Sequence, residues 1–203
     1  MASARFSSSE SGFSLIETLV AVGIFATVAL GVAQLFMVAT DANRAAKFQT
    51  SATTMAEQKM EQLRGLMWGF DTTGLGLPVS DTTTNLANSP ADATGTGLNP
   101  SPAGTLNVNT AGFVDFLGAN GEYLGTGDTP PMTTVYIRRW SIEPLPTNPN
   151  NTLVFQVVVT TAIRERLRQR DANPAAKQKL PGDAWLVSMK TRKATCANGS
   201  TSC

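Results

Sequence analysis

The longest apolar stretch in the chain lies close to its N-terminus. Between Leu19 and Ala39, 21 consecutive residues carry no charge. As an α-helix this stretch is about 32 Å long, which is close to the hydrocarbon thickness of a lipid bilayer. A secretory signal peptide has a shorter apolar core that ends at a small-residue cleavage site. The pattern therefore predicts a membrane-spanning helix that the mature protein retains.

A second set of apolar positions follows this stretch and has the period of a helix. Its members recur at the spacing of one helical face: Ala52, Met55, Ala56, Met60, Leu63 and Met67. Polar residues such as Gln49 and Glu57 occupy the other faces, and no proline interrupts the chain before Pro78. We expect one helix from about Phe13 to Met67, with an amphipathic second half that packs on the rest of the chain.

The clearest strand patterns lie in the C-terminal third. Residues 133–142, 152–163 and 183–193 are rich in β-branched and aromatic side chains. A cluster of prolines and asparagines at residues 144–151 separates the first two segments, and short turns favour antiparallel pairing. The predicted fold is therefore α+β, with a long N-terminal helix packed against a small antiparallel β-sheet.

Residues 69–131 lack both patterns. They include eleven glycines and six prolines, a composition that does not bury enough apolar surface to form a core of its own. We expect a long surface loop there, with one short strand within Leu106–Phe116. Asp115, Asn120 and Glu122 offer the oxygen ligands that calcium prefers, but their spacing matches no EF-hand loop, and we predict no metal site.

Charge is distributed unevenly, although the net charge is only +1. The sum is 0 for residues 1–68, −6 for residues 69–131 and +7 for residues 132–203. Six basic side chains lie between the last two predicted strands: Arg164, Arg166, Arg168, Arg170, Lys177 and Lys179. This segment has three interpretations, namely a solvated hairpin loop, a docking surface for an acidic partner such as residues 69–131 of another subunit, or a contact with DNA phosphates. The lack of aromatic residues within it disfavours base stacking.

Histidine is absent from the chain, and the two cysteines are Cys196 and Cys203. The commonest general base and the commonest metal ligand are therefore missing, and two cysteines do not complete a four-ligand zinc site. This composition argues against most hydrolases and metalloenzymes. We predict neither an enzymatic activity nor a cofactor.

Glu17 places a carboxylate within the apolar N-terminal segment. Ionisable groups in membrane spans are costly and often functional, although a carboxylate near the interface can reach water. The surrounding residues, Gly12-Phe13-Ser14-Leu15-Ile16-Glu17, followed by the long apolar helix, resemble the prepilin cleavage and methylation signature of type IV pilins and type II secretion pseudopilins. The resemblance implies that prepilin peptidase cuts between Gly12 and Phe13 on the cytoplasmic side and then methylates the new Phe13 amine. It also implies that Glu17 pairs with the Phe13 amine of a neighbouring subunit.

The same resemblance divides the chain into parts. Residues 1–12 are a leader, residues 13–40 the half of the helix that lies in the membrane and later in the filament core, and residues 41–68 the amphipathic half. Residues 69–203 are an exported globular domain. In such a domain the two cysteines form a disulfide within residues 196–203 or stay free, and a carboxyl-terminal disulfide loop is common among type IV pilins.

A second resemblance concerns residues 133–193. The order Tyr136-Ile137-Arg138-Arg139-Trp140, a turn and a valine-rich strand is similar to the soluble domains of minor pilins, closest to the V-type modification protein of the type IV pilus. Many major pilins carry a helix-kinking proline where this chain has Gln34, which favours a minor pilin or a pseudopilin. We therefore expect a structural subunit of a type IV pilus, with a type II secretion pseudopilin or a tip adhesin or DNA-binding minor pilin as alternatives.

These resemblances also imply partners and a location. The expected partners are prepilin peptidase, which is also the N-methyltransferase, other pilin subunits, the inner-membrane assembly platform and, before assembly, membrane lipid. Nucleic acid is the least favoured partner. The expected location is the bacterial inner membrane with the N-terminus in the cytoplasm, followed by the periplasm and the cell-surface pilus.

Overall fold

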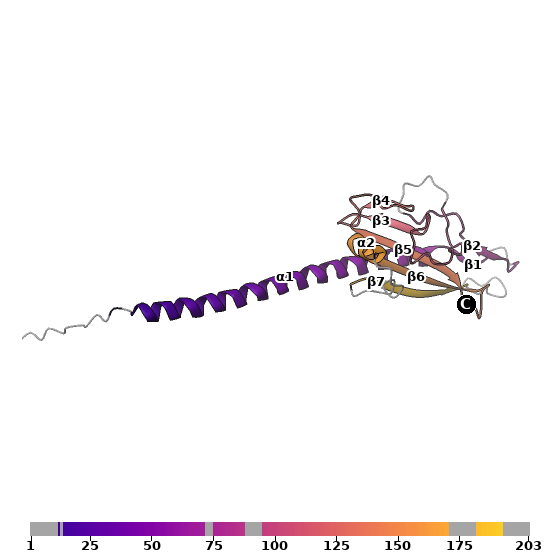
Figure 1. Cartoon of the computed structure of the whole chain (residues 1–203). Helices are drawn as coiled ribbons and strands as arrows, with labels where there is room; N and C mark the ends of the chain where they lie inside the picture. Colours follow the sequence, from indigo (N-terminus) through magenta and orange to yellow (C-terminus); the bar gives the residue numbers. More distant parts are fainter. Residues whose placement is uncertain (1–11, 13, 72–74, 88–94, 171–181, 193–203) are drawn as a thin grey trace, which may run out of the picture. The chain divides into compact units, whose positions relative to one another are not determined.

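The computed structural model describes residues 12, 14–71, 75–87, 95–170 and 182–192. The chain divides into two compact units, residues 1–45 and residues 46–203. One helix, α1 (Leu15–Gly65), runs through the boundary, so its first part belongs to one unit and its second part to the other. Figure 1 labels α1 and the elements that follow it in chain order.

α1 is uninterrupted over 51 residues, which confirms the predicted long helix. It contains no proline, and it ends at Gly65, in agreement with the tendency of glycine to terminate helices. At this end the Lys190 ammonium donates hydrogen bonds to the carbonyl oxygens of Arg64 (2.5 Å) and Leu66. These bonds satisfy acceptors that have no partner within the helix.

The second unit is built around a five-stranded antiparallel sheet in the order β4-β3-β5-β6-β7. Its strands are β3 (Val114–Leu117), β4 (Tyr123–Gly125), β5 (Tyr136–Pro144), β6 (Thr152–Thr161) and β7 (Ala184–Thr191). A separate two-stranded sheet joins β1 (Trp68–Phe70) to β2 (Pro78–Ser80), and α2 (Ala162–Arg170) follows β6 without a break.

β5, β6 and β7 confirm the three predicted C-terminal strands and their antiparallel pairing. The differences are at the strand ends. β5 begins three residues later than predicted, at Tyr136, because the Thr134 N–H donates to the Pro131 carbonyl (3.1 Å) in a turn. β6 ends at Thr161, because Ala162 and the residues after it belong to α2.

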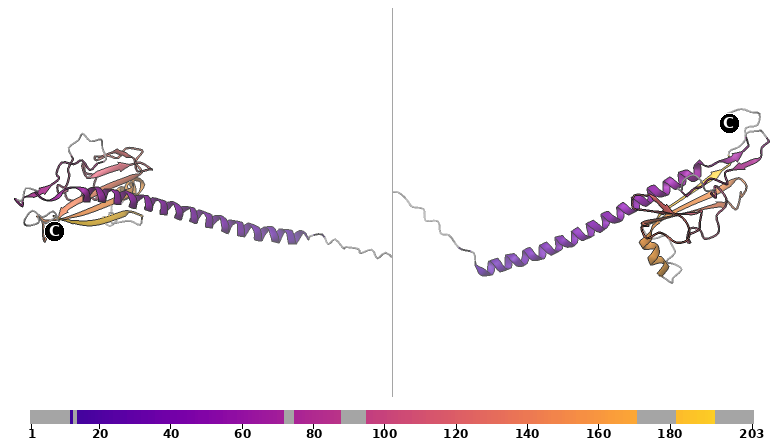
Figure 2. Two further views of the ribbon diagram at one scale, coloured as in Figure 1. Left: turned by 180° about the vertical axis from the view of Figure 1, so that it is seen from behind. Right: turned by 90° about the horizontal axis from the view of Figure 1, so that it is seen from above.

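The second part of α1 lies across one face of the five-stranded sheet, as two views show (Figure 1 and Figure 2). Its buried stripe consists of Ala52, Met55, Ala56, Lys59, Met60 and Leu63. The stripe shares a core with alternate residues of the central strands, among them Tyr136, Trp140, Ile142, Leu153, Phe155, Val157 and Val159. Because successive side chains in a strand point to opposite faces, these residues all face α1.

The predicted apolar stripe is therefore confirmed, except at its last member. Met67 is 56% exposed. The helix ends at Gly65, so residue 67 no longer continues the helical face that carries Leu63. A smaller cluster, Val114, Phe116, Ile137 and Ala162, covers part of the opposite face of the sheet.

The prediction of a long surface loop over residues 69–131 is wrong in part. The segment supplies β2, β3 and β4, and the last two belong to the main sheet. Leu86, Leu98, Phe113 and Leu117 are buried in the core beside α1. Leu86 and Leu98 stand among threonine, asparagine and glycine, so no periodicity marks them in the sequence. Phe113 and Leu117 belong to a run that is too short to show a period. The strand predicted within Leu106–Phe116 lies at Val114–Leu117.

Candidate functional site

The residues of the N-terminal motif lie at the start of α1. Gly12 is exposed and irregular, and Ser14 is the last described residue before the helix. The Ser14 carbonyl oxygen accepts hydrogen bonds from the Thr18 N–H (3.2 Å) and from the Thr18 hydroxyl (3.1 Å). The helical hydrogen bonds thus start at Ser14, next to the expected cleavage site. Phe13 lies outside the described residues.

Glu17 lies in the first turn of α1 and is exposed. The positive end of the helix dipole favours a carboxylate at this position. Every described residue of the first unit is exposed as well, so the carboxylate stands on a helix that no other part of this unit covers. The position is compatible with a contact to another molecule.

The apolar side chains around Glu17 cover all sides of the helix. The following large ones are exposed: Leu15, Ile16, Leu19, Val20, Val22, Ile24, Phe25, Val28, Leu30, Val32, Leu35, Phe36, Met37 and Val38. Among the described residues, α1 is long and apolar enough to cross a membrane. A helix that is apolar all round is stable only in apolar surroundings, which are a bilayer or other helices.

Residues 7–33 match the family described as the prokaryotic N-terminal methylation motif. The match supports a type IV pilin-like family. It covers the segment before α1 and the first part of the helix, where the exposed apolar residues and Glu17 lie. Comparisons with curated proteins and with solved structures gave no significant match.

The methylation motif indicates a pilin- or pseudopilin-type substrate of prepilin peptidase. It implies assembly with other pilin subunits, and it suggests a structural subunit rather than an enzyme. The apolar helix that follows is consistent with membrane anchoring. The α+β fold of a long N-terminal helix packed on antiparallel strands is consistent with that of pilins.

A buried ionic cluster ties the second part of α1 to the sheet. The Asp115 carboxylate on β3 accepts hydrogen bonds from Arg138 Nε (3.0 Å) and Nη2 (2.6 Å) on β5. Lys59 Nζ, on α1, lies 2.9 Å from the same Asp115 oxygen, and all three side chains are buried. Arg138 Nη1 also donates to the Met55 carbonyl (3.0 Å), and the Lys59 ammonium donates to the Leu86 carbonyl.

Lys59 is the least favourably placed charge of this cluster. Burial lowers the pKa of Lys59 to about 8, the Asp115 carboxylate opposes this shift, and the Arg138 guanidinium adds to it. The Lys59 ammonium lies 4.3 Å from the centre of the Trp140 ring, a distance at which the ring attracts a cation. Two buried cations share one carboxylate, so the loss of Asp115 would leave both without a counter-ion.

This ionic cluster was not predicted from the sequence. A signal was present, because Lys59 falls within the apolar stripe of α1, between Ala56 and Met60. The cluster also involves Asp115, which was weighed with Asn120 and Glu122 as a source of calcium ligands in the sequence. Asp115 is committed to Lys59 and Arg138, and the Glu122 carboxylate accepts the Asn120 N–H (3.0 Å) in the turn before β4.

The interpretation of residues 164–182 as a solvated hairpin loop is wrong for the part that the structure describes. Residues 162–170 form α2. The Arg168 side chain is only 8% exposed, and its Nη2 lies 2.7 Å from Asp183 Oδ2. Its Nη1 lies 3.5 Å from Glu165 Oε2, and Arg164 Nη1 lies 3.9 Å from Asp183 Oδ1. Glu165 within the segment and Asp183 directly after it thus neutralise part of the charge of the segment.

Glu165 also joins α2 to the sheet. Its Oε1 lies 2.9 Å from Nη2 of the buried Arg139 on β5, and Arg139 donates further hydrogen bonds to the Asn109 side chain (2.9 and 2.7 Å). Of the six basic residues singled out in the sequence, Arg168 is therefore an internal ion-pair residue, and Arg166 is exposed. The Arg170 side chain, Lys177 and Lys179 lie outside the described residues, as do Cys196 and Cys203.

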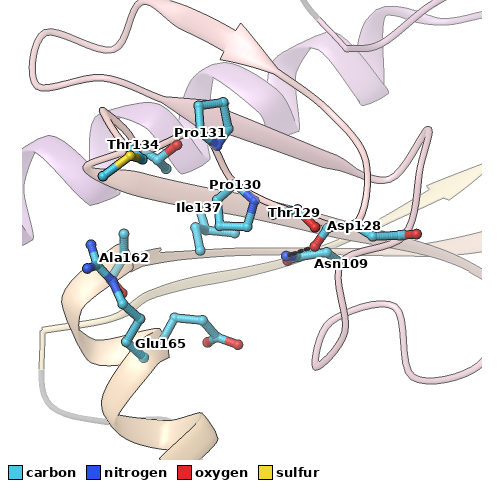
Figure 3. A pocket seen from close by; sticks show the side chains of 11 residues that line it. Asn109, Asp128, Thr129, Pro130, Pro131, Thr134, Ile137, Ala162 and Glu165 are labelled. Atoms are coloured by element: carbon cyan, nitrogen blue, oxygen red, sulfur yellow. Dashed lines mark hydrogen bonds between the residues drawn. The ribbon is translucent and has the colours of Figure 1, made fainter.

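A pocket of about 390 Å³ lies beside α2 (Figure 3). Pro130, Pro131, Ile137 and Ala162 supply its apolar side, and Asn109, Asp128 and Glu165 are among its polar lining residues. Arg139 and Arg168 form ion pairs with the Glu165 carboxylate, so this acidic side chain in the pocket wall has a role in holding the fold together. Within the described part of the chain, no group of three or more acidic, cysteine or histidine side chains could hold a metal ion.

Proposed function

We propose that the chain is a minor pilin, a structural subunit that enters a type IV pilus after prepilin peptidase cleaves it between Gly12 and Phe13. One observation carries the proposal. The methylation motif at residues 7–33 leads into a helix whose apolar first part is exposed on all sides. Such a surface requires lipid or other helices around it. The membrane before assembly and the filament core after assembly supply these two environments.

Glu17 and the N-methylated amine of Phe13 provide the specific contact between subunits. In hydrocarbon a carboxylate and an ammonium each lose hydration, and mutual pairing recovers part of that cost. Apolar helices gain little by associating within lipid, so one charge pair sets the axial register of neighbouring helices. The exposed position of Glu17 on the first turn of α1 supports this role.

The remainder of the chain is the exported domain, which the assembly platform moves out of the inner membrane towards the cell surface. In that oxidising compartment Cys196 and Cys203 form a disulfide. Closing so short a loop contributes roughly 2.5 kcal/mol to stability in the chain-entropy model. A carboxyl-terminal loop of this kind favours a pilin over a pseudopilin.

A type II secretion pseudopilin is the alternative with which the helix is also compatible. α1 runs without a break through Gln34, at the position where many major pilins have a kinking proline. This feature is equally compatible with a minor pilin and a pseudopilin. A DNA-binding tip pilin has less support, because Arg168 is paired inside the domain and Arg164 faces Asp183.

Fractionation of cells that carry a deletion of the gene, with and without the wild-type copy, tests the proposal. A minor pilin is present in sheared surface filaments at a low ratio to the major subunit, and its deletion alters piliation while secretion stays normal. A secretion defect with normal pili would replace the proposal with the pseudopilin. If the chain is absent from filaments and the deletion changes neither process, the chain is not a filament subunit.

A further inference from the structure

The two edges of the main sheet differ in how they are protected. At one edge, β4 has three residues, and a register shift between Phe116 and Leu117 interrupts its pairing with β3. At the other edge, β7 has eight residues and pairs with β6 in unbroken register from Ala184 to Thr191. Short strands and bulges are devices that keep sheet edges from pairing with other chains. β4 therefore has this protection and β7 does not.

Other protective devices are also missing from β7. It contains no proline, and its single charged residue, Lys190, lies on the face towards α1. The Lys190 ammonium donates to carbonyl oxygens at the end of α1, so its charge does not keep another strand from pairing with the outer edge of β7. Among the described residues, no strand pairs with the outer edge of β7 (Figure 1).

The face of β7 that points away from α1 carries an apolar strip. Trp185, Val187 and Met189 alternate with the residues that face the helix, and all three are exposed. On β6 they lie opposite Val158, Gln156 and Val154, so the strip is continuous with the neighbouring strand. Exposed tryptophan and methionine side chains grouped in this way are typical of protein interfaces.

The size of the strip decides which partner fits. A stable complex between folded domains buries about 800 Å² on each side, from roughly 20–30 residues. The strip offers three exposed residues on a single strand, which is too little for a second folded copy. It matches the width of one extended segment, whose main chain would also satisfy the N–H and C=O groups along the open edge.

We propose that β7 binds one extended segment of a partner protein by strand addition. Apolar, uncharged side chains at alternate positions of this segment pack on Trp185, Val187 and Met189. The interaction requires neither cleavage of the N-terminus nor filament assembly, so it stands or falls separately from the proposed function.

The test uses the full chain in lipid nanodiscs and the peptide Thr-Val-Thr-Val-Thr-Val-Thr, acetylated at its amino end, as a probe. Trp68 and Trp140 are buried, so acrylamide quenching of tryptophan fluorescence reports mainly on Trp185. We expect the peptide to lower this quenching at least twofold. The same peptide with every backbone nitrogen methylated keeps the side chains but has no N–H left on either edge to donate to β7, and it should not protect Trp185.

A matched pair of variants locates the binding. Val187 on the strip is 61% exposed, and Val108 in the loop between β2 and β3 is 63% exposed. We expect Val187→Lys to weaken peptide binding at least tenfold and Val108→Lys to leave it unchanged, with both variants showing the far-UV circular dichroism of the wild type. Three results would overturn the proposal: no protection by millimolar peptide, equal binding by the methylated peptide, or equal binding by Val187→Lys. Quenching of Trp185 by brominated lipid in the nanodisc would assign the strip to the membrane surface and would also overturn it.

Discussion

The two parts of α1 share one backbone conformation but differ in what surrounds them. Between Leu15 and Val38 the apolar side chains point to all sides and are exposed, whereas between Ala52 and Leu63 they form one stripe that is buried against the sheet. The second part is thus satisfied within its own chain. The first part is complete only in lipid or among other subunits. A helical conformation alone does not show whether a segment packs within its own chain or in lipid or among other subunits. The distribution of apolar residues around the helix axis shows this.

The largest expected effect is that of a substitution at Glu17, the carboxylate in the exposed first part of α1. We expect Glu17→Ala to insert into the membrane normally and to fall at least about tenfold in sheared filaments, because the proposed charge pair with the Phe13 amine of a neighbouring subunit is lost. Glu57→Ala removes a carboxylate from the exposed side of the second part and should leave incorporation unchanged. Quantitative immunoblots of membranes and filaments provide the measurement. Normal incorporation of Glu17→Ala would mean that the carboxylate merely reaches water at the interface.

The next effect concerns the ionic cluster that fastens the second part of α1. Asp115→Asn leaves the buried Lys59 and Arg138 charges without a counter-ion, and we expect it to lower the free energy of unfolding by about 3–5 kcal/mol. Asp128→Asn changes an exposed carboxylate in a loop and serves as the control. Urea unfolding of the full chain in detergent micelles, followed by tryptophan fluorescence, measures both. Equal stability of the two variants would show that the cluster does not hold the helix in place.

Two leucines allow the same substitution to be compared in both parts of the helix. Leu63 is fully buried, so Leu63→Ala should cost about 2–5 kcal/mol of unfolding free energy through lost burial and a cavity. Leu35 is exposed in the first unit, and Leu35→Ala should change the stability of the second unit by less than about 0.5 kcal/mol. The same urea titration reports both values. Similar losses of unfolding free energy at the two positions would contradict the division of α1 into an exposed first part and a second part that packs on the sheet.

The smallest effect at neutral pH is expected for Lys59→Met. The variant removes the surplus positive charge and keeps the Asp115–Arg138 pair, so its stability at pH 7 should lie close to that of the wild type or above it. Because the pKa of Lys59 is about 8 in the folded chain and has its ordinary value near 10.5 in the unfolded chain, the unfolded state binds more protons between these values. Wild-type stability should therefore rise with pH across this window, relative to the variant, by about 3 kcal/mol at most. A pH series of unfolding curves for the two proteins that stays parallel from pH 7 to 10.5 would contradict this assignment.

Sequence patterns predicted the parts of the fold that repeat over many residues. The uninterrupted apolar run and the stripe from Ala52 to Leu63 identified α1, and the valine-rich and aromatic runs identified β5, β6 and β7. The short strand expected within Leu106–Phe116 anticipated part of β3, but β3 and β4 span only four and three residues, which is too short for a period to be recognised. Their place in the sheet depends on pairing with a strand that lies further along the chain.

Charged residues were harder to interpret than apolar ones. The sequence shows Lys59, Asp115 and Arg138 but not that folding brings them together, because they are far apart along the chain. The segment from Arg164 to Arg170 was interpreted by its charge alone, and α2 was not predicted. Its arginine, glutamate, leucine and glutamine residues are all good helix formers and favour this helix. The short motif at Gly12–Glu17 could be interpreted from the sequence alone, because a cleavage and methylation signature depends on neighbouring residues and not on tertiary contacts.

Mass spectrometry of the amino terminus tests the central claim most directly, namely that the first part of α1 serves processing and assembly. The native protein would be isolated from sheared surface filaments and from membranes and digested to release its N-terminal peptide. The account predicts a peptide from filaments that begins at N-methylated Phe13. An intact leader, with Gly12 still joined to Phe13 in both fractions, would contradict the account and leave an ordinary membrane-anchored protein.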